Sequence, residues 1–457
     1  MTDRRAIGTG WVFVCALAVG APGVATLAAA EEIAAKRAQE VGLQPGMMLD
    51  QSTASLAKGL MPPEILKHYE QGEYKNEIAD WPATTGTHGP DFEAQTKRNA
   101  ETLTLDENDT IVDKSTGKQP PHIYGTPFPT IDPKDPRAPV KVLWNYFYNY
   151  YWNGNSHNVV DLVWVNPTGF DRKAGQDVYF KYYDGLPPDL RPAENPLNLL
   201  NQFIAATIDP QDLYGTTALG WRYRDPQQRD SVWAYVPALR RIRGLSPANR
   251  SDGFLGSDMS QDDGPYFDGK PEDFTWKLVG EEEILRHVDP YRLKQECKVL
   301  PLPEGGWRTV FPDVPNLGFQ TPDWKGVAWA PTVMKLARRK VWIIEGVPKD
   351  KYYLYGRIEL RIDQHSWQGS YNRKFSWQGE LLNTSMAAGG PGWPTPDGKH
   401  FLSIGGCGGA AAQIAENVKL NRATLARISP KADIPNDRHV PMDPSFFDYQ
   451  TLYRFGK

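Results

Sequence analysis

The stretch RRKVWIIEGVPKDKYYLYGRIELRIDQHSWQGSYNRKFSWQGELL, residues 338–382, contains three consecutive runs with the character of β-strands. The first, 341–346, is short and apolar. The second, 352–363, alternates between two sets of side chains, and a period of two places successive side chains on opposite faces of a sheet. One face carries Tyr352, Leu354, Ile358, Leu360 and Ile362, and the other carries Tyr353, Tyr355, Arg357, Glu359, Arg361 and Asp363. The run predicts a strand with an apolar face and a solvated face.

The third run, 374–381, repeats the pattern. It sets Phe375, Trp377, Gly379 and Leu381 against Lys374, Ser376, Gln378 and Glu380. The connection at 364–366 is short enough for antiparallel neighbours. An antiparallel sheet with one apolar face needs a cover or a ligand on that face, so the functional question is which of the two it has.

Composition narrows the class of protein. The chain has 457 residues, of which 39 are Pro and 41 are Gly, and this favours many short strands and long loops over a helical bundle. The length suits one large domain or two ordinary ones. The formal charge of -4 and the absence of a long basic stripe argue against binding to nucleic acid.

The first 30 residues have the three parts of a secretory signal peptide. Arg4 and Arg5 precede a mostly apolar run at 7–17, and Ala28, Ala29 and Ala30 offer a cleavage site. An uncleaved membrane anchor is disfavoured because the apolar core is short. No later stretch is apolar enough for a transmembrane helix. We therefore expect an exported protein whose mature chain, 31–457, forms a single large domain.

Export leaves two cysteines, Cys297 and Cys407. In an oxidising compartment they form a disulfide bond or remain two buried thiols, and sequence spacing does not distinguish these outcomes. Neither cysteine has the Cys and His neighbours of a zinc site.

Strand signals recur along the chain. Helices are expected at 32–41, at 64–69 behind Pro62 and Pro63, and at 410–427, with a helix also favoured for the aromatic run 143–152. Further strands are expected at 159–165, 177–183, 203–208, 217–224, 232–237, 240–244 and 274–280. Long loop excursions are expected at 80–139, 251–269 and 301–323. About ten strands suit one large, strongly curved sheet.

Signals for catalysis are weak. The eight histidines are scattered, and Ser403 lacks the glycine two positions earlier that a nucleophile elbow needs. The glycine-rich patch 405–409 lacks the lysine and hydroxyl residue of a phosphate loop, which favours a tight turn. No catalytic residue is predicted. The 15 tryptophans suit stacking on sugars, so a carbohydrate-binding or glycan-hydrolysing β-protein is the alternative reading.

Two blocks resemble a known family. The segment 230–243, DSVWAYVPALRRIR, resembles the W-x-Y-x-P-x-x-R-R-x-R segment of exported proteobacterial proteins catalogued as domain of unknown function 1329 (DUF1329). Residues 268–280 and the hairpin 360–381 are similar to its later segments, and the resemblance covers roughly 45–430. Departures at Asn372 and Arg373, and at Gln364 and His365, affect turns.

The resemblance implies both fold and function. The family is similar to the outer-membrane lipoprotein-sorting proteins LolA and LolB, which implies an incomplete antiparallel β-barrel closed by helices round an apolar cavity. It implies a periplasmic carrier or chaperone, in a Gram-negative bacterium, for a lipid, a lipoprotein acyl chain or another hydrophobic ligand. Envelope transporters of the resistance-nodulation-division type are the implied partners. The family supplies no catalytic residues and no cofactor.

The apolar face and this resemblance together predict a ligand-binding wall. Its candidate lining is Trp233, Tyr235, Tyr352, Leu354, Ile358 and Trp377, with ordinary core packing as the alternative for each. Arg240, Arg241 and Arg243 are candidates for an anionic headgroup, because arginine pairs well with phosphate and carboxylate. Their alternative role is pairing with the acidic residues Asp258, Asp262, Asp263 and Asp268. These aspartates lack the spacing of an EF-hand calcium loop, and no metal site is predicted.

Overall fold

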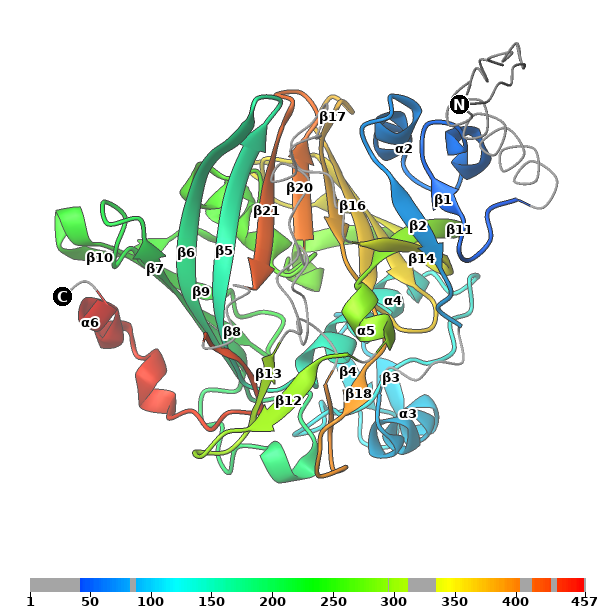
Figure 1. Ribbon diagram of the computed structural model, residues 1–457. Coiled ribbons are helices and arrows are strands. Elements are labelled where there is room, and N and C mark those ends of the chain that lie inside the picture. Colours follow the sequence, from blue (N-terminus) through cyan, green and yellow to red (C-terminus); the bar gives the residue numbers. More distant parts are fainter. Residues whose placement is uncertain are drawn as a thin grey trace, which may run out of the picture. The chain divides into compact units, whose positions relative to one another are not determined.

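A computed structural model of the chain describes residues 42–82, 88–294, 296–310, 334–402, 413–428 and 434–455 (Figure 1). The chain divides into two units, 1–42 and 43–457, and every described helix and strand belongs to the second. The expected signal peptide and the expected helix at 32–41 lie outside the described residues. Among the helices that are described, none has the length and apolar character needed to cross a membrane.

One 18-stranded sheet dominates the described residues. Its continuous antiparallel run, in spatial order, is β11 (Phe274–Val288), β14 (Lys335–Pro348), β15 (Arg357–Asp363), β16 (Gly369–Phe375), β17 (Leu381–Ala387), β20 (Gln413–Asn417), β21 (Arg422–Ile428), β5 (Ser156–Asn166), β6 (Gly169–Tyr182), β7 (Leu199–Asp209), β8 (Thr217–Tyr223), β9 (Ser231–Val236) and β10 (Arg241–Leu245). The expectation of a mainly β fold built on a large antiparallel sheet is confirmed.

Shorter elements extend the sheet and flank it. The remaining strands are β1 (Met48–Leu49), β2 (Asn76–Ala79), β3 (Leu103–Leu105), β4 (Ile111–Asp113), β12 (Lys298–Pro301), β13 (Trp307–Val310), β18 (Trp393–Pro394), β19 (Phe401–Leu402) and β22 (Asn436–Arg438). The α-helices are α2 (Pro63–Glu70), α3 (Pro90–Thr102), α4 (Ala138–Tyr151), α5 (Pro290–Lys294) and α6 (Leu452–Phe455). The 3-10 turns are η1 (Ala54–Ala57), η2 (Pro188–Leu190), η3 (Pro237–Leu239), η4 (Pro247–Ser251), η5 (Phe254–Gly256), η6 (Gln261–Asp263), η7 (Pro271–Asp273), η9 (Pro444–Phe447) and η10 (Tyr449–Thr451). Of these strands, β2 pairs with β14 in parallel, and β22 pairs with β5.

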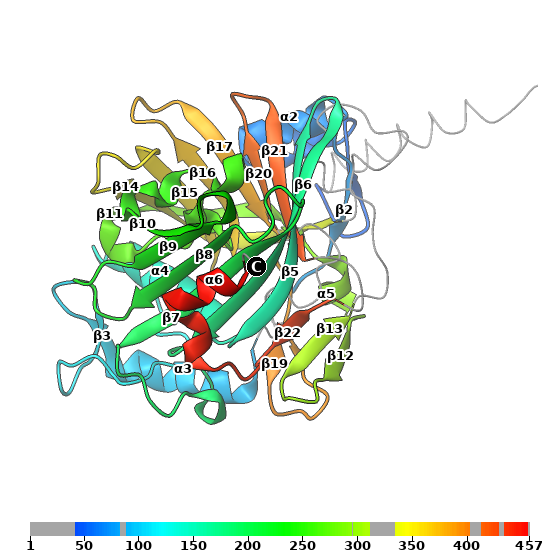
Figure 2. The ribbon, with the colours of Figure 1, turned by 90° about the vertical axis from the view of Figure 1, so that its left-hand side faces the viewer.

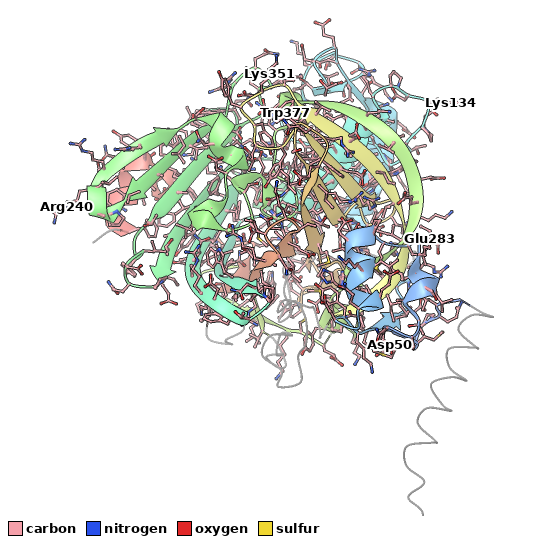
Figure 3. The ribbon with its side chains drawn as sticks, turned by 90° about the horizontal axis from the view of Figure 1, so that it is seen from above. Asp50, Lys134, Arg240, Glu283, Lys351 and Trp377 are labelled. Atoms are coloured by element: carbon pink, nitrogen blue, oxygen red, sulfur yellow. The ribbon has the colours of Figure 1, made fainter. Side chains whose placement is uncertain are left out.

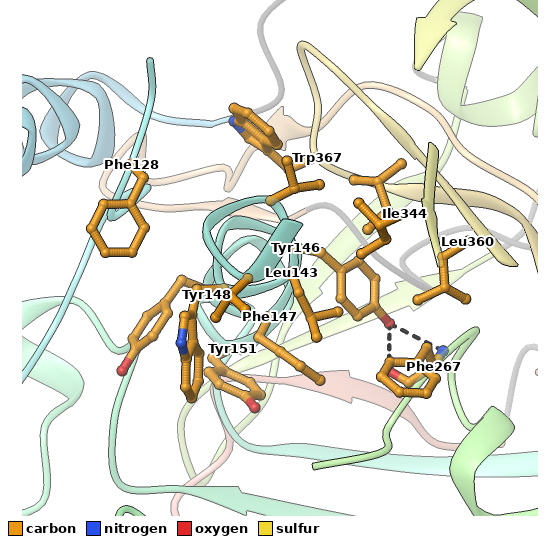
Figure 4. Close-up of a cluster of buried hydrophobic side chains, with 14 of the residues drawn as sticks. Phe128, Leu143, Tyr146, Phe147, Tyr148, Tyr151, Phe267, Ile344, Leu360 and Trp367 are labelled. Atoms are coloured by element: carbon orange, nitrogen blue, oxygen red, sulfur yellow. Dashed lines mark hydrogen bonds between the residues drawn. The ribbon is translucent and has the colours of Figure 1, made fainter. Parts of the chain in front are cut away.

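The aromatic run forms helix α4, as expected, and the sheet bends round this helix. Twelve of its 14 residues are buried, which is typical of a helix in the middle of a core (Figure 4). Tyr151 contacts Tyr182 of β6 at 5.5 Å between ring centroids, while Trp342 and Ile344 of β14 belong to the same core. Six strands separate β6 from β14, roughly 34 Å if the sheet were flat, yet a helix is only about 10–12 Å wide. The sheet must therefore curl.

Residues 338–382 depart from their predicted strand pattern in two places. Strand β15 begins only at Arg357, and in the preceding turn Tyr353 and Tyr355 are buried, whereas Tyr352 is 88 % exposed and Leu354 is 49 % exposed. The predicted strand at 374–381 contains only the end of β16 and the first residue of β17, and 376–380 form the turn between them. Turns break the period of two, so the face assignment fails there, while the antiparallel pairing of β15 with β16 is confirmed.

The face of β15 predicted to meet water is covered. Asp363 is fully buried and accepts hydrogen bonds from Arg339, from Nε at 2.7 Å and from Nη2 at 3.0 Å. On the same face of the neighbouring strands, Glu64 of α2 accepts a 2.8 Å hydrogen bond from Arg373. The N-terminal elements η1 and α2 thus form a second cover, which buries both faces of the sheet around Ile343 and Tyr371, while Val279 of β11 and Val347 of β14 remain exposed.

Three further expectations are corrected. The predicted excursion at 80–139 contains α3 and the β3–β4 hairpin, and its Ile111 and Phe128 pack in the α4 core. The predicted helix at 410–427 is the hairpin β20–β21 where it is described, because pairing with β17 and β5 outweighs local helix propensity. The predicted linker 301–323 begins with the end of β12 and with β13, and its part beyond 310 lies outside the described residues, as do 405–409.

Segment 251–269 is packed against the sheet and is not the loop excursion that the sequence suggested. The Tyr266 hydroxyl lies 3.0 Å from the carbonyl oxygens of Arg361 and Tyr371. The Tyr146 hydroxyl of α4 lies 2.7 Å from the carbonyl oxygen of Pro265 and 3.0 Å from that of Phe267 (Figure 4). The segment is therefore held between the helix and the strands.

A buried ion cluster ties this segment to β8. It consists of Arg222, Arg250, Asp230, Asp262 and Asp268. Asp230 accepts a 2.9 Å hydrogen bond from each of the two arginines. Asp262 accepts one hydrogen bond from Arg250 Nε at 2.6 Å and another from the Tyr353 hydroxyl at 2.8 Å. Burial raises the pKa of Asp230, but the two arginines outweigh it and the pKa is lowered. Asp230 is thus held in its ionised form, whereas burial outweighs the same two arginines at Asp268 and raises its pKa.

We predict that Asp230→Asn destabilises the protein by about 3–5 kcal/mol, because two buried guanidinium groups then lose their shared anionic partner. Urea unfolding followed by circular dichroism measures the change. Exposed Asp212→Asn is the matched control and should stay within about 0.5 kcal/mol of the wild type. Equal stability of the two variants would contradict a structural role for the cluster.

We also predict a loss of stability in acid from the buried imidazole of His287. Burial, with a smaller contribution from Arg286, lowers its pKa from 6.5 to about 3. Because the folded-state pKa lies below the unfolded one, the contribution of His287 is complete above pH 6.5 and is lost as the pH falls toward 3, by about 1.4 kcal/mol per unit. His287→Leu should flatten the plot of unfolding free energy against pH between 6 and 4. The exposed His365→Gln control should not alter the slope.

Candidate ligand-binding face

The large aromatic residues predicted to line a wall on β9 face protein. Trp233 and Tyr235 point toward the C-terminal tail, 442–455, which crosses one face of β7–β9 (Figure 2). Tyr235 is only 5 % exposed and its ring lies 5.3 Å from that of Tyr453 in α6. Trp233 packs at 5.1 Å against Trp221. The core alternative therefore holds for Tyr235, whereas Trp233 is half-buried at the edge of the same cluster.

The other predicted lining residues lie elsewhere. Ile358 is buried in the α4 core. Tyr352, Leu354 and Trp377 are exposed on two neighbouring turns, where the Trp377 indole donates a 2.9 Å hydrogen bond to the carbonyl oxygen of Tyr353. Figure 3 shows Trp377 beside Lys351 and far from Arg240. The structure does not bring the six predicted residues together.

The predicted arginines lie on the β9–β10 hairpin. Arg240 occupies its turn with a φ of 47°, and Arg241 and Arg243 are exposed on β10. None of the three has an ion pair within the described part of the chain. The aspartates suggested as their partners are bonded elsewhere: Asp258 to Arg422, Asp262 to Arg250, Asp263 to Lys374, and Asp268 to Arg222. The proposed pairing of these arginines with that acidic loop is therefore wrong.

The face of β6–β10 turned away from the C-terminal tail, here called the open face, carries small apolar side chains in register. Its middle row consists of Val178, Ala205, Ala218, Ala234 and Arg243, each opposite the next across adjacent strands. The four apolar members are half-buried, whereas Ile204 and Leu219 on the tail face are fully buried. The open face of β6–β10 is therefore partly exposed to solvent.

Two further rows flank the middle row. One consists of Phe180, Phe203, Gly220, Val232 and Leu245, again in register. Glycine is required at 220, because an added Cβ would lie 2.0 Å from the Phe203 ring. On the other side, Gln176 stands opposite Thr207 and Val236 stands opposite Arg241. Among the described residues, the buried atoms Gln176 Nε2 and Thr207 Oγ1 have no hydrogen-bond partner.

The chemistry of the open face is that of a lipid-sized binding surface. The middle row crosses four inter-strand spacings, roughly 19 Å, from Val178 to Arg243. At the β6 end of the open face, Phe180 of the neighbouring row stacks on Tyr182 beside α4. At the β10 end, the guanidinium groups of Arg241 and Arg243 are exposed to solvent. By contrast, the hollow between α4 and β8 that is lined by Trp144, Arg222 and Lys270 holds about 20 Å³, space for about one water molecule. Side chains thus occupy nearly all of the space beside the helix.

The described residues offer no obvious metal centre, since no three His, Cys, Asp or Glu side chains gather suitably among them. Cys407 lies outside the described residues, so its pairing with Cys297 stays a prediction.

Sequence reasoning missed the open face because it selected the large aromatic residues. The signal was present in the small residues at alternate positions, Ala218 and Gly220 in one strand and Ala234 in the next. A period of two shows that Trp233 and Ala234 face opposite ways, but not which of the two faces is covered.

The fold and this face define a mostly β protein, built on one open antiparallel sheet with few helices. The model of the family described as "Protein of unknown function (DUF1329)" matches residues 50–452, and the chain belongs to this family, as its sequence blocks suggested. A curated relative, Uncharacterized protein PA3922 of Pseudomonas aeruginosa, is 21 % identical over 271 residues, covering 57 % of this chain and 52 % of the relative. The chain thus spans about half the length of that relative.

Solved structures with low identity are also similar. A putative outer membrane lipoprotein-sorting protein domain from Vibrio parahaemolyticus is 15 % identical with a TM-score of 0.43, covering 69 % of this chain and 97 % of that one. A DUF1329 family protein from Desulfovibrio piger is 15 % identical with a TM-score of 0.41, covering 67 % and 97 %. The LolA superfamily protein NE2245 from Nitrosomonas europaea is 11 % identical with a TM-score of 0.38, covering 67 % and 96 %.

We predict that substitutions at two neighbouring positions on β8 change the free energy of unfolding by very different amounts. Leu219→Ala should cost about 2–5 kcal/mol, because Leu219 is fully buried under the C-terminal tail. Ala218→Ser should change stability by less than about 0.5 kcal/mol, because Ala218 lies on the open face. Urea denaturation measures both, and a large cost at Ala218 would mean that the face is closed.

Proposed function

We propose that this protein is a carrier in the bacterial envelope that holds the hydrocarbon part of a lipid or another hydrophobic molecule on its open face. The observation that carries the proposal is the apolar middle row on β6–β9, whose members Val178, Ala205, Ala218 and Ala234 are in register and half-buried, with Phe180 and Phe203 half-buried beside it. Contiguous exposed apolar surface on a water-soluble domain is typical of binding sites.

The small side chains suit an extended hydrocarbon chain. Ala205, Ala218 and Ala234 form a low floor between the bulkier Phe203 and the polar pair Gln176 and Thr207. A chain lying along this floor removes apolar surface from water without displacing any core residue. No covalent step is needed, so the proposal is one of binding and not of catalysis.

The expected strength of binding suits a carrier. Burial of a methylene is worth about 0.8 kcal/mol, and a flat face covers about half of it, so ten to fifteen methylenes contribute roughly 4–6 kcal/mol. This corresponds to a Kd between about 1 mM and about 40 μM. Such a complex exchanges readily, which a molecule that must release its cargo requires.

We predict that the delipidated mature protein, titrated into a micromolar solution of the neutral probe N-phenyl-1-naphthylamine, raises the fluorescence of the probe in a saturable way. Ala218→Glu, which places a carboxylate in the middle row, should weaken probe binding at least tenfold. Leu420→Glu is the matched control, because Leu420 is 58 % exposed on the β20–β21 turn, away from the open face. It should bind like the wild type.

Two results would contradict the carrier. One is a wild-type protein that neither binds the probe nor releases lipid on solvent extraction after purification from envelopes. The other is unchanged binding by Ala218→Glu, which would place the probe elsewhere on the protein. Binding to glycans in the absence of any lipid would favour the carbohydrate alternative.

A further inference from the structure

We infer that the cargo is a single-chain amphiphile with an anionic end, and that Arg241 and Arg243 of β10 bind that carboxylate or phosphate. This inference rests on the proposed function and adds to it the chemical class of the ligand and a headgroup subsite.

The register of the sheet places both arginines at the ends of the rows. Arg243 stands opposite Ala234 in the middle row, and Arg241 stands opposite Val236 in the next. Residues two apart along a strand share a face and lie about 7 Å apart. The two guanidinium groups therefore extend from one edge of the open face, side by side, where the end of a bound chain would emerge.

The charges of these arginines are not neutralised by the described protein. Of the other arginines near this face, Arg222 and Arg250 are buried and bonded to aspartates of the ion cluster, and Arg438 is buried and bonded to Asn158. Arg241 and Arg243 are exposed and make no ion pair within the described ranges. Two adjacent free guanidinium groups are well suited to an anion, because each can donate a pair of hydrogen bonds to a carboxylate or a phosphate.

The opposite end of the rows gives the ligand a direction. Beyond β6 the rows continue into β5, where Asn158 stands opposite Val178 and Ser156 stands opposite Phe180. Asn158 is buried and accepts a hydrogen bond from the buried Arg438, while Phe180 stacks on Tyr182 of the α4 core. This end is therefore shielded and its Asn158 is already bonded within the protein, whereas the guanidinium groups at the β10 end are exposed. An amphiphile is thus oriented with its tail toward α4 and its anion at the sheet edge.

The row next to the middle row begins with two polar side chains. Gln176 and Thr207 stand directly opposite each other, and within the described residues Gln176 Nε2 and Thr207 Oγ1 have no hydrogen-bond partner. Both side chains are buried by the protein, so this pair bounds the apolar middle row and is not itself exposed to a ligand.

The test compares ligands with the same tail and different ends. Decanoate, decyl phosphate and decanol compete for N-phenyl-1-naphthylamine at pH 8, each below the concentration at which it aggregates. We expect the two anions to bind the wild type at least tenfold more tightly than decanol, with an advantage that shrinks as salt is added. Tighter binding of decanoate would identify the anionic end as a carboxylate, and tighter binding of decyl phosphate would identify it as a phosphate.

The matched variant is Arg241→Gln with Arg243→Gln. It should weaken both anions at least tenfold and leave decanol unchanged. Arg240→Gln is the control, because Arg240 lies in the hairpin turn outside the rows. Thermal unfolding monitored by circular dichroism confirms that each variant folds.

Several outcomes overturn the inference. Equal affinity of the wild type for decanol and the anions removes the headgroup subsite but leaves the carrier intact. A double variant that loses decanol together with the anions shows that the arginines only support the fold. Flotation of the protein with anionic vesicles, without uptake of monomeric amphiphile, assigns the arginines to a membrane surface. Failure of the probe and all three ligands removes the proposed function itself.

Discussion

The structure depends on the buried ion cluster that joins β8 to segment 251–269. Arg222 on the strand and Arg250 at the start of the segment share the carboxylate of Asp230, and Asp262 connects Arg250 to the buried hydroxyl of Tyr353. Charges buried in a protein interior are tolerated only when their partners are close and correctly oriented. The cluster therefore allows one placement of the segment, across the sheet and against α4.

That placement makes the two halves of the sheet different. From β11 to β21, segment 251–269 and α4 cover one face while η1 and α2 cover the other, so apolar residues such as Ile343 and Leu360 are core. From β6 to β10, the C-terminal tail covers one face, and the opposite face keeps alanines half-buried. The half from β6 to β10 thus keeps one partly exposed face, which the half from β11 to β21 largely lacks.

Local patterns predicted many elements well. The aromatic run became α4 because Pro139 suits a first helical turn and most of its side chains are apolar or aromatic, as in a helix buried in a core. The alternation in β15 placed Ile358, Leu360 and Ile362 together on one face, as the structure has them. The patterns failed at Tyr352–Gly356, where a turn replaced a strand, and at β20–β21, where neighbouring strands supplied hydrogen bonds that the isolated segment lacks. For the candidate site, the arginines were found, but the aromatic residues chosen with them mostly proved to be core or turn residues.

The amino-acid sequence by itself determined which side chains share a face, because alternation along a strand follows from the geometry of one backbone. It separated Ala234 from Trp233 and Tyr235, and put Arg241 and Arg243 on one side of their strand. Only the tertiary structure decided which face was covered, because burial depends on what distant segments bring to it. The C-terminal tail lies on the side of Ile204, Leu219 and Tyr235, and for this reason those residues are core while Ala234 on the opposite side stays half-buried.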